Sequence, residues 1–233
     1  MVTCLGDAVF PRVGVATVLL LRRLGVEVDF PAAQTCCGQP HFNSGYHDEA
    51  RLLAKHTIEA FSRSETVVTP SGSCAAMVKL EFPELFHDDP AWHGRAVELA
   101  GKTRELSDFL VNVLKTDDVG ARYPARVTYH MACHLRGLNL LTEPERLLSK
   151  VRELTLVPLE RFDECCGFGG SFSVRYGGIS GAMVADKCAL VEKAGVDAVV
   201  ATDAGCLMNI AGCLRRRGSG VRALHLAEVL EKT

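Results

Sequence analysis

The cysteine positions constrain this chain more than any other feature of its 233 residues. Three cysteines recur 129 residues later (133 − 4, 165 − 36 and 166 − 37), and a fourth recurs after 132 residues (206 − 74). Each copy contains a Cys-Cys-Gly triplet, and repetition of this kind indicates a duplicated architecture. The two sets are Cys4, Cys36, Cys37 and Cys74, and Cys133, Cys165, Cys166 and Cys206.

The residues around the repeated cysteines also match between the two copies. Glu65–Cys74 reads ETVVTPSGSC and Asp197–Cys206 reads DAVVATDAGC. A short β-branched run followed by a small-residue turn predicts a buried strand, a glycine-containing loop and a helix that starts at or just after the cysteine. Apolar runs at Val26–Phe30 and Leu154–Val157 predict a further strand before each Cys-Cys-Gly triplet.

Segments with helical spacing and one polar face separate these strands. They are Arg12–Leu24, His47–Phe61, Ala182–Ala194 and Cys206–Arg217. Helices that alternate with fully apolar strands predict an α/β fold with parallel sheets, here as two similar Rossmann-like halves related by internal duplication. The polar stretch Thr116–Pro124 contains Gly and Pro, so we place the boundary there, with repeats at residues 1–118 and 119–233.

Charge and hydropathy exclude several classes of partner. The formal net charge is −2, from 26 basic and 28 acidic side chains, which predicts binding neither to nucleic acid nor to an anionic membrane surface. The apolar stretch Val13–Leu21 is about half of the roughly 20 residues that a bilayer crossing needs. The N-terminal residues do not follow the order of a secretory signal. We therefore expect a cytoplasmic protein that is not an integral membrane protein.

Ten cysteines in a cytoplasmic protein favour metal binding or redox chemistry over disulfides, because the cytosol keeps thiols reduced. Neighbouring Cα atoms are about 3.8 Å apart, whereas disulfides prefer about 5.5 Å, so Cys36 and Cys37 are poor disulfide partners. An iron–sulfur cluster offers several irons that each take one thiolate, so four cysteines from three loops can hold it. A four-thiolate zinc site needs the same number of ligands and stays open.

The remaining candidates are less specific. Cys188 and Cys213 lie outside the repeat among apolar neighbours, and we interpret them as core residues. His130 and His134 flank Cys133 and are compatible with a mixed His/Cys site of the Rieske kind. Since each cysteine set is complete without them, the sequence favours an outer or surface role, with proton-coupled tuning of the second centre as the alternative. No motif predicts an autonomous dehydrogenase, and no catalytic residue is predicted.

The cysteine pattern resembles the duplicated cysteine-rich, or CCG, domain family over essentially the whole chain. This family includes the cysteine-rich subunit of heterodisulfide reductase and the iron–sulfur subunits of glycerol-3-phosphate and glycolate oxidising systems. Finer matches are similar to its lactate utilization protein A branch: QTCCGQPHFNSGY, PSGSCAAM, YHMACHLRGL, ECCGFGGSFSVRY and GCLMNI.

The resemblance implies an iron–sulfur electron-transfer subunit of a multi-protein system that oxidises L-lactate to pyruvate, an oxidoreductase component rather than an autonomous enzyme. It implies two partner proteins, one of them a ferredoxin-like iron–sulfur protein. It also implies two [4Fe–4S] clusters, with the eight repeated cysteines as ligands. The chain departs from the heterodisulfide reductase subunit at Met77 and Asn209, where that subunit has the second cysteine of CxxC. This departure disfavours the five-cysteine clusters that cleave disulfides.

Two other functions remain open from the sequence. One is a thiol–disulfide or quinone-linked reductase subunit of the heterodisulfide reductase type, which would act at an open cluster face. The other is a zinc-stabilised interaction module without a redox role.

Overall fold

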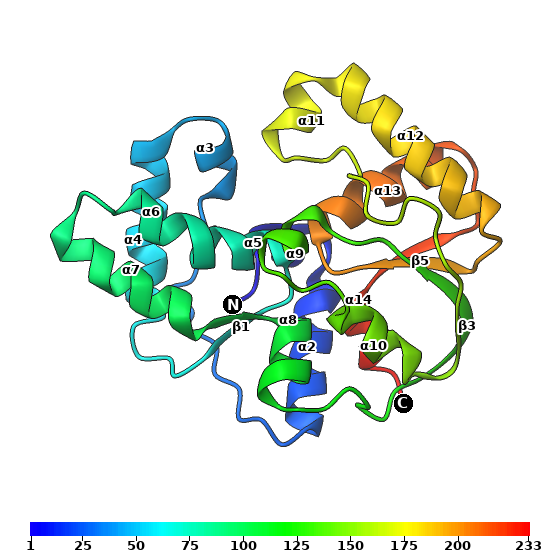
Figure 1. Ribbon diagram of the computed structural model, residues 1–233, viewed down its shortest axis with the longest axis horizontal. Coiled ribbons are helices and arrows are strands. Elements are labelled where there is room, and N and C mark those ends of the chain that lie inside the picture. Colours follow the sequence, from blue (N-terminus) through cyan, green and yellow to red (C-terminus); the bar gives the residue numbers. More distant parts are fainter.

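The computed structural model describes residues 1–233, and its helices and strands alternate along most of the chain (Figure 1). The first half contains α1 (Cys4–Val9), α2 (Pro11–Arg23), α3 (Gln39–Asn43), α4 (His47–Ala60), β1 (Val67–Thr69), α5 (Gly72–Ala76), the π-helix η1 (Met77–Glu81), α6 (Phe82–Leu85), α7 (Pro90–Lys102), β2 (Thr103–Glu105), α8 (Leu106–Asp108) and the π-helix η2 (Phe109–Val113). The second half contains β3 (Arg122–Tyr129), α9 (Cys133–Gly137), α10 (Glu143–Ser149), β4 (Arg152–Leu156), α11 (Ser171–Arg175), α12 (Gly177–Lys193), β5 (Ala198–Ala201), α13 (Ala204–Arg216), β6 (Arg222–His225) and α14 (Leu226–Leu230).

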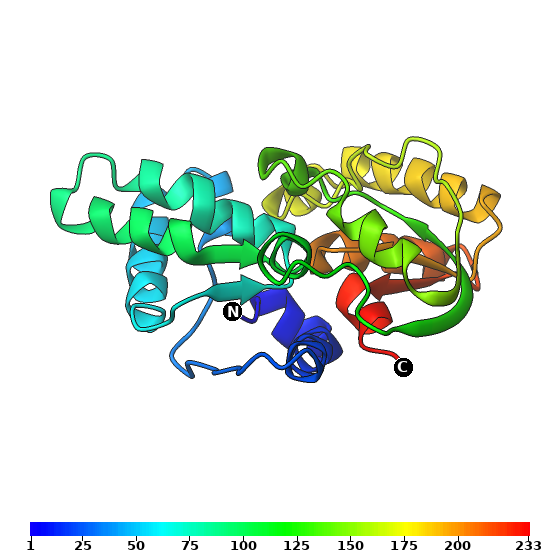
Figure 2. The same cartoon turned by 60° about the horizontal axis from the view of Figure 1, so that its bottom comes forward.

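All strand pairs are parallel, and they form two sheets (Figure 2). In the first half β1 pairs with β2, and in the second half the strand order is β4-β3-β5-β6. Every residue of β5 is buried, as expected for an inner strand that helices cover on both faces. The predicted α/β class with parallel sheets is confirmed, and the Rossmann-like character of each half stays a prediction.

Two local predictions were wrong. Val26–Phe30 is not a strand, whereas its counterpart in the second half is β4. Glu27, Asp29 and Phe30 are exposed, and the first-half sheet has only two strands, so this segment has no strand beside it. The helices α5 and α13 begin two residues before Cys74 and Cys206, which places both cysteines in the first helical turn.

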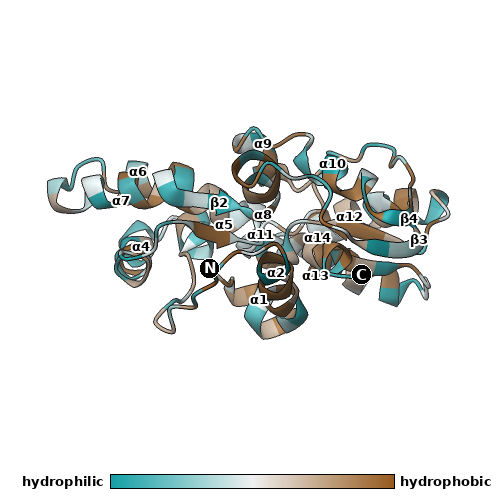
Figure 3. Cartoon of the chain, turned by 90° about the horizontal axis from the view of Figure 1, so that it is seen from below, coloured by the Kyte–Doolittle hydropathy of each residue, from teal (hydrophilic) through white to brown (hydrophobic).

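One hydrophobic core joins the two halves. Leu20 and Leu21 of α2 belong to the same buried cluster as Val127 of β3 and Leu230 of α14. The apolar side of α2 lies beside α14 in Figure 3. The Arg23 guanidinium donates hydrogen bonds to backbone carbonyls at the C-terminal end of the chain. The halves are therefore packed as one body, and the repeat boundary at residues 118 and 119 stays a prediction from the sequence.

None of the helices combines the length and the apolar character that crossing a bilayer requires.

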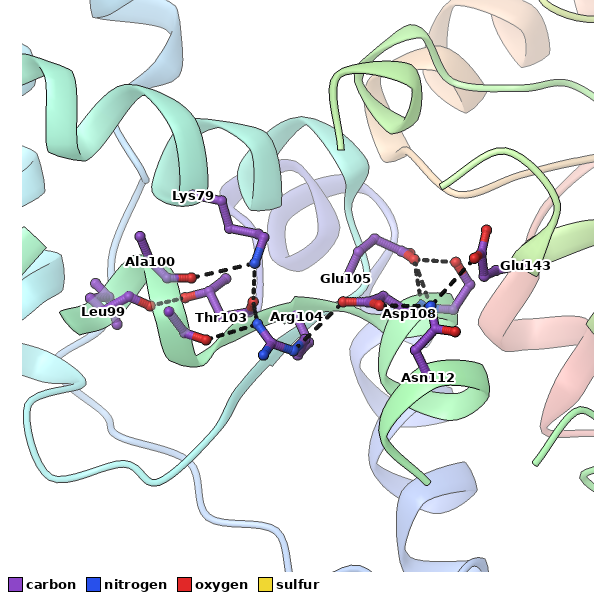
Figure 4. A network of polar contacts seen from close by, with 11 residues as sticks. Lys79, Leu99, Ala100, Thr103, Arg104, Glu105, Asp108, Asn112 and Glu143 are labelled. Carbon is purple, nitrogen blue, oxygen red and sulfur yellow. Dashed lines mark hydrogen bonds and ion pairs between the residues drawn. The ribbon is translucent and has the colours of Figure 1, made fainter. Parts of the chain in front are cut away.

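A buried carboxyl group closes the end of the first-half sheet. Glu105 ends β2 and is 1% exposed. Its Oε2 accepts hydrogen bonds from the backbone N–H groups of Ser107 and Asp108 at the start of α8, while its Oε1 has no partner. Figure 4 shows this group within a polar network that reaches Lys79 and α7. Burial raises the pKa of Glu105 to about 7.

We expect Glu105→Gln to remove part of the pH dependence of stability. Folding raises the pKa of the Glu105 carboxyl from 4.5 to about 7, so the folded state favours its protonated form. The contribution of this carboxyl to the stability of the fold is complete below pH 4.5 and is lost as the pH rises through about 7. Between pH 5 and pH 8 this group should lower the free energy of unfolding by about 2 to 3 kcal/mol. Urea unfolding at both pH values measures the difference, with the exposed Glu98→Gln as the control. Equal pH dependence in wild type and Glu105→Gln would contradict this account.

Candidate metal centre

The first cysteine set comes together from three loops. Cys4 begins α1, Cys36 and Cys37 precede α3, and Cys74 lies in the first turn of α5. The Sγ atoms of Cys4 and Cys36 are 3.7 Å apart, and those of Cys37 and Cys74 are 3.4 Å apart. The thiols of Cys36 and Cys37 also interact, so the four sulfurs form one continuous group.

The second set repeats this arrangement with the equivalent elements. Cys133 begins α9, Cys165 and Cys166 precede α11, and Cys206 lies in the first turn of α13. The thiols of Cys133 and Cys165 interact, as do those of Cys166 and Cys206. The structure thus gathers the eight cysteines in the two groups of four that the sequence repeat predicts.

The first cysteine of each Cys-Cys-Gly triplet has a lowered pKa. The thiols of Cys37 and Cys4 and the N–H of Gly38 donate hydrogen bonds to the sulfur of Cys36, and they lower its pKa to about 2. The same interactions raise the pKa values of Cys4 and Cys37. The pKa of Cys165 is likewise lowered to about 2 by its neighbours. Cys36 and Cys165 are therefore favoured as thiolates, and a bound metal would displace the protons of the neighbouring thiols whose pKa is raised.

The glycine of each Cys-Cys-Gly triplet shapes the loop around the sulfurs. Gly38 and Gly167 have φ values of +85° and +80°, which a residue with a Cβ rarely adopts. Their N–H groups point at the sulfurs of Cys36 and Cys165 over 3.4 Å. A Cβ at Gly167 would also lie 2.8 Å from the carbonyl oxygen of Ser180. These loops therefore require glycine for their backbone conformation, and they aim an N–H donor at a sulfur.

Both cysteine sets line the same cavity, which has a volume of about 490 Å³. Residues of α3 line one side and residues of α11 line the other, and these two helices face each other at the top of Figure 1. Groups bound by the two sets would consequently face each other across one shared space. The sequence repeat did not predict this arrangement.

A single carboxylate joins the two halves beside the cysteines. Asp203 is the N-cap of α13, and its Oδ1 accepts a hydrogen bond from the N–H of Gly205. Its Oδ2 accepts from the N–H of Ser73 at 2.8 Å and from the Ser71 hydroxyl at 3.3 Å. Ser71 in turn accepts from the N–H of Cys74. One side chain therefore fixes the first turns of both α5 and α13.

Sequence reasoning missed this link, although a signal was present. Ser71 and Asp203 stand three residues before Cys74 and Cys206, at equivalent positions of the repeat. Both residue types are common helix N-caps. The spacing indicates a cap in each half, but it contains no information about a bond between the halves.

A second contact across the halves involves His134. Its Nε2 lies 3.2 Å from the Gln39 side-chain nitrogen, and its Nδ1 lies 3.6 Å from the sulfur of Cys133. Gln39 also donates a hydrogen bond to the carbonyl of Ser73. His134 thus lies at the cavity wall where the halves meet.

The two remaining cysteines lie outside the sulfur groups, as do the two residues that depart from the heterodisulfide reductase pattern. Cys188 and Cys213 are buried between α12 and α13 and do not line the cavity. Met77 is fully buried in the core of the first half. Asn209 donates a hydrogen bond to the carbonyl of Cys166 at 2.9 Å, so it supports the cysteine loop through the backbone.

Comparison with known proteins agrees with this geometry. Residues 1–79 and 127–211 match the family described as "Cysteine-rich domain", CCG, and these two segments contain the eight gathered cysteines. The chain belongs to the CCG family. It is 54% identical over 230 residues to lactate utilization protein A of Geobacillus kaustophilus (strain HTA426), covering 98% of this chain and 96% of that protein. It is 50% identical to lactate utilization protein A of Exiguobacterium sp. (strain ATCC BAA-1283 / AT1b), covering 99% and 95%.

The match confirms the resemblance that the cysteine motifs indicated. Each of the two matched segments contains one of the two cysteine sets.

Proposed function

We propose that each cysteine set binds a [4Fe–4S] cluster and that the protein is an iron–sulfur electron-transfer subunit. The observation that carries this proposal is the convergence of two equivalent groups of four sulfurs on one cavity. Thiolate sulfur is the ligand that such clusters require, and adjacent cysteines can bind different irons of one cluster. The N–H groups of Gly38 and Gly167 are placed to hydrogen-bond sulfur and to tune the reduction potential.

For the reaction, we propose L-lactate oxidation to pyruvate within a multi-protein system. The relatives described above are named lactate utilization protein A, and the match extends over nearly their full length. Oxidation of lactate to pyruvate releases two electrons and two protons, and two one-electron centres match that number. The proposed location is the cytoplasm, with two partner proteins, one of them ferredoxin-like.

A four-thiolate zinc site in each set is the second candidate. A Zn–S bond of about 2.3 Å gives a tetrahedron whose sulfur atoms are about 3.8 Å apart. The sulfur separations of 3.4 and 3.7 Å in the first set are close to this value. Such a protein would be a zinc-stabilised interaction module without a redox role.

Metal analysis of single-cysteine variants distinguishes the two candidates. Anaerobically purified wild type should contain about eight irons and about eight sulfides per chain. Cys36→Ala and Cys165→Ala should each lose about half of both, because each removes a ligand from one set only. Cys188→Ala, a cysteine remote from the cavity, is the matched control and should keep the full content. Stoichiometric zinc in place of iron would contradict the cluster proposal and support the zinc module.

Growth on lactate tests the proposed reaction. A strain that lacks the gene and has no paralogue should fail to grow on L-lactate, and the wild-type gene should restore growth. The Cys36→Ala gene should not restore it, whereas the Cys188→Ala gene should. Unimpaired growth of the deletion strain would remove lactate from the proposal and leave the metal assignment intact.

A further inference from the structure

His130 is a fully buried histidine whose side chain has no hydrogen-bond partner. Its exposed fraction is 0%, and neither Nδ1 nor Nε2 forms a hydrogen bond. Its backbone N–H donates to the carbonyl of Val200, which fixes the residue at the carboxyl ends of β3 and β5. Leaving a buried polar group unpaired costs about 1 to 3 kcal/mol. The position therefore calls for an interaction that the protein alone does not provide.

A second buried histidine shows what a purely structural role looks like in this chain. His225 is also 0% exposed, but both of its ring nitrogens are used. Its Nδ1 accepts a hydrogen bond from the N–H of Ala227, and its Nε2 lies 3.1 Å from the carbonyl oxygen of Pro70. His130 lacks such partners although it is equally buried.

The surroundings of His130 provide a set of metal donors. One of its ring nitrogens and the sulfurs of Cys166 and Cys206 all lie within 4.8 Å of one another. No histidine forms such a group with the cysteines of the first set. The second cysteine set thus has a nitrogen donor that the first set lacks.

The charge state of the ring suits a metal ligand. Full burial without a hydrogen-bond partner favours the uncharged form of the His130 imidazole. A neutral imidazole has one N–H and one free lone pair. The backbone carbonyl of Phe162 lies near the ring, outside hydrogen-bond geometry. Metal-bound histidines commonly donate their other N–H to a nearby carbonyl.

We propose that His130 is a nitrogen ligand to the metal centre of the second cysteine set, in addition to its four cysteines, which makes that centre a mixed cysteine and histidine site. This inference rests on the proposed iron–sulfur function and extends it. The first centre would have sulfur ligands only. The two centres would then differ in their ligands, and we expect them to differ in reduction potential.

Isotope labelling tests this ligand in the unaltered protein. Full-length protein is purified anaerobically from a histidine auxotroph grown on [15N]histidine or on unlabelled histidine, and the reduced centres are measured by pulsed EPR. We expect a strong nitrogen hyperfine coupling of a directly bound imidazole that changes with the isotope. Full iron content with no nitrogen coupling, or with only the weak coupling of a hydrogen-bonded ring, would overturn the ligand assignment. The proposed function would still stand. Absence of iron would overturn both.

Two variants identify which histidine is the ligand. His130→Gln should lose the strong coupling and shift one of the two reduction potentials, with the other unchanged. His134→Gln is the matched control, since His134 lies beside Cys133 but its Nδ1 is 3.6 Å from that sulfur and its Nε2 faces Gln39. This variant should keep the strong coupling. Loss of the coupling in His134→Gln and its retention in His130→Gln would overturn the assignment.

Discussion

The Asp203 carboxylate joins the two halves at the point where both cysteine sets are built. Its two oxygens accept N–H donors from the first turns of α13 and α5, which contain Cys206 and Cys74. Buried carboxylates satisfied by several N–H donors hold their surroundings rigidly, because losing one bond leaves an unpaired buried group. The shared cavity, and the distance between whatever groups the two sets bind, depend on this link.

The repeat in the sequence predicted much of the fold, but it did not predict how the halves differ. Helices at Arg12–Leu24 and His47–Phe61 agree with α2 and α4 within a residue, because their apolar spacing reports one buried face. The apolar run Val26–Phe30 resembles a strand locally, but a strand also needs a neighbouring strand to bond with. That neighbour is absent from the two-stranded sheet of the first half.

The candidate site shows the same limit. The spacing of the eight cysteines was enough to divide them into two sets, because equivalent loops of a duplicated fold bring equivalent residues together. Repeats contain no information about their own relative orientation, so the common cavity and the Asp203 link had to come from the structure. His130 was assigned an outer role because four cysteines already completed each set. Its full burial and its unpaired ring nitrogens change that interpretation, and neither is visible in a sequence.

The central claim is that two metal clusters occupy one cavity between the halves, each bound by one set of four cysteines. Anomalous diffraction from anaerobically grown crystals, recorded above and below the iron absorption edge, tests it most directly. The account predicts two separate iron clusters in the cavity, one at the sulfurs of Cys36 and Cys37 and one at those of Cys165 and Cys166. Anomalous signal at the zinc edge alone, or iron bound outside this cavity, would contradict it.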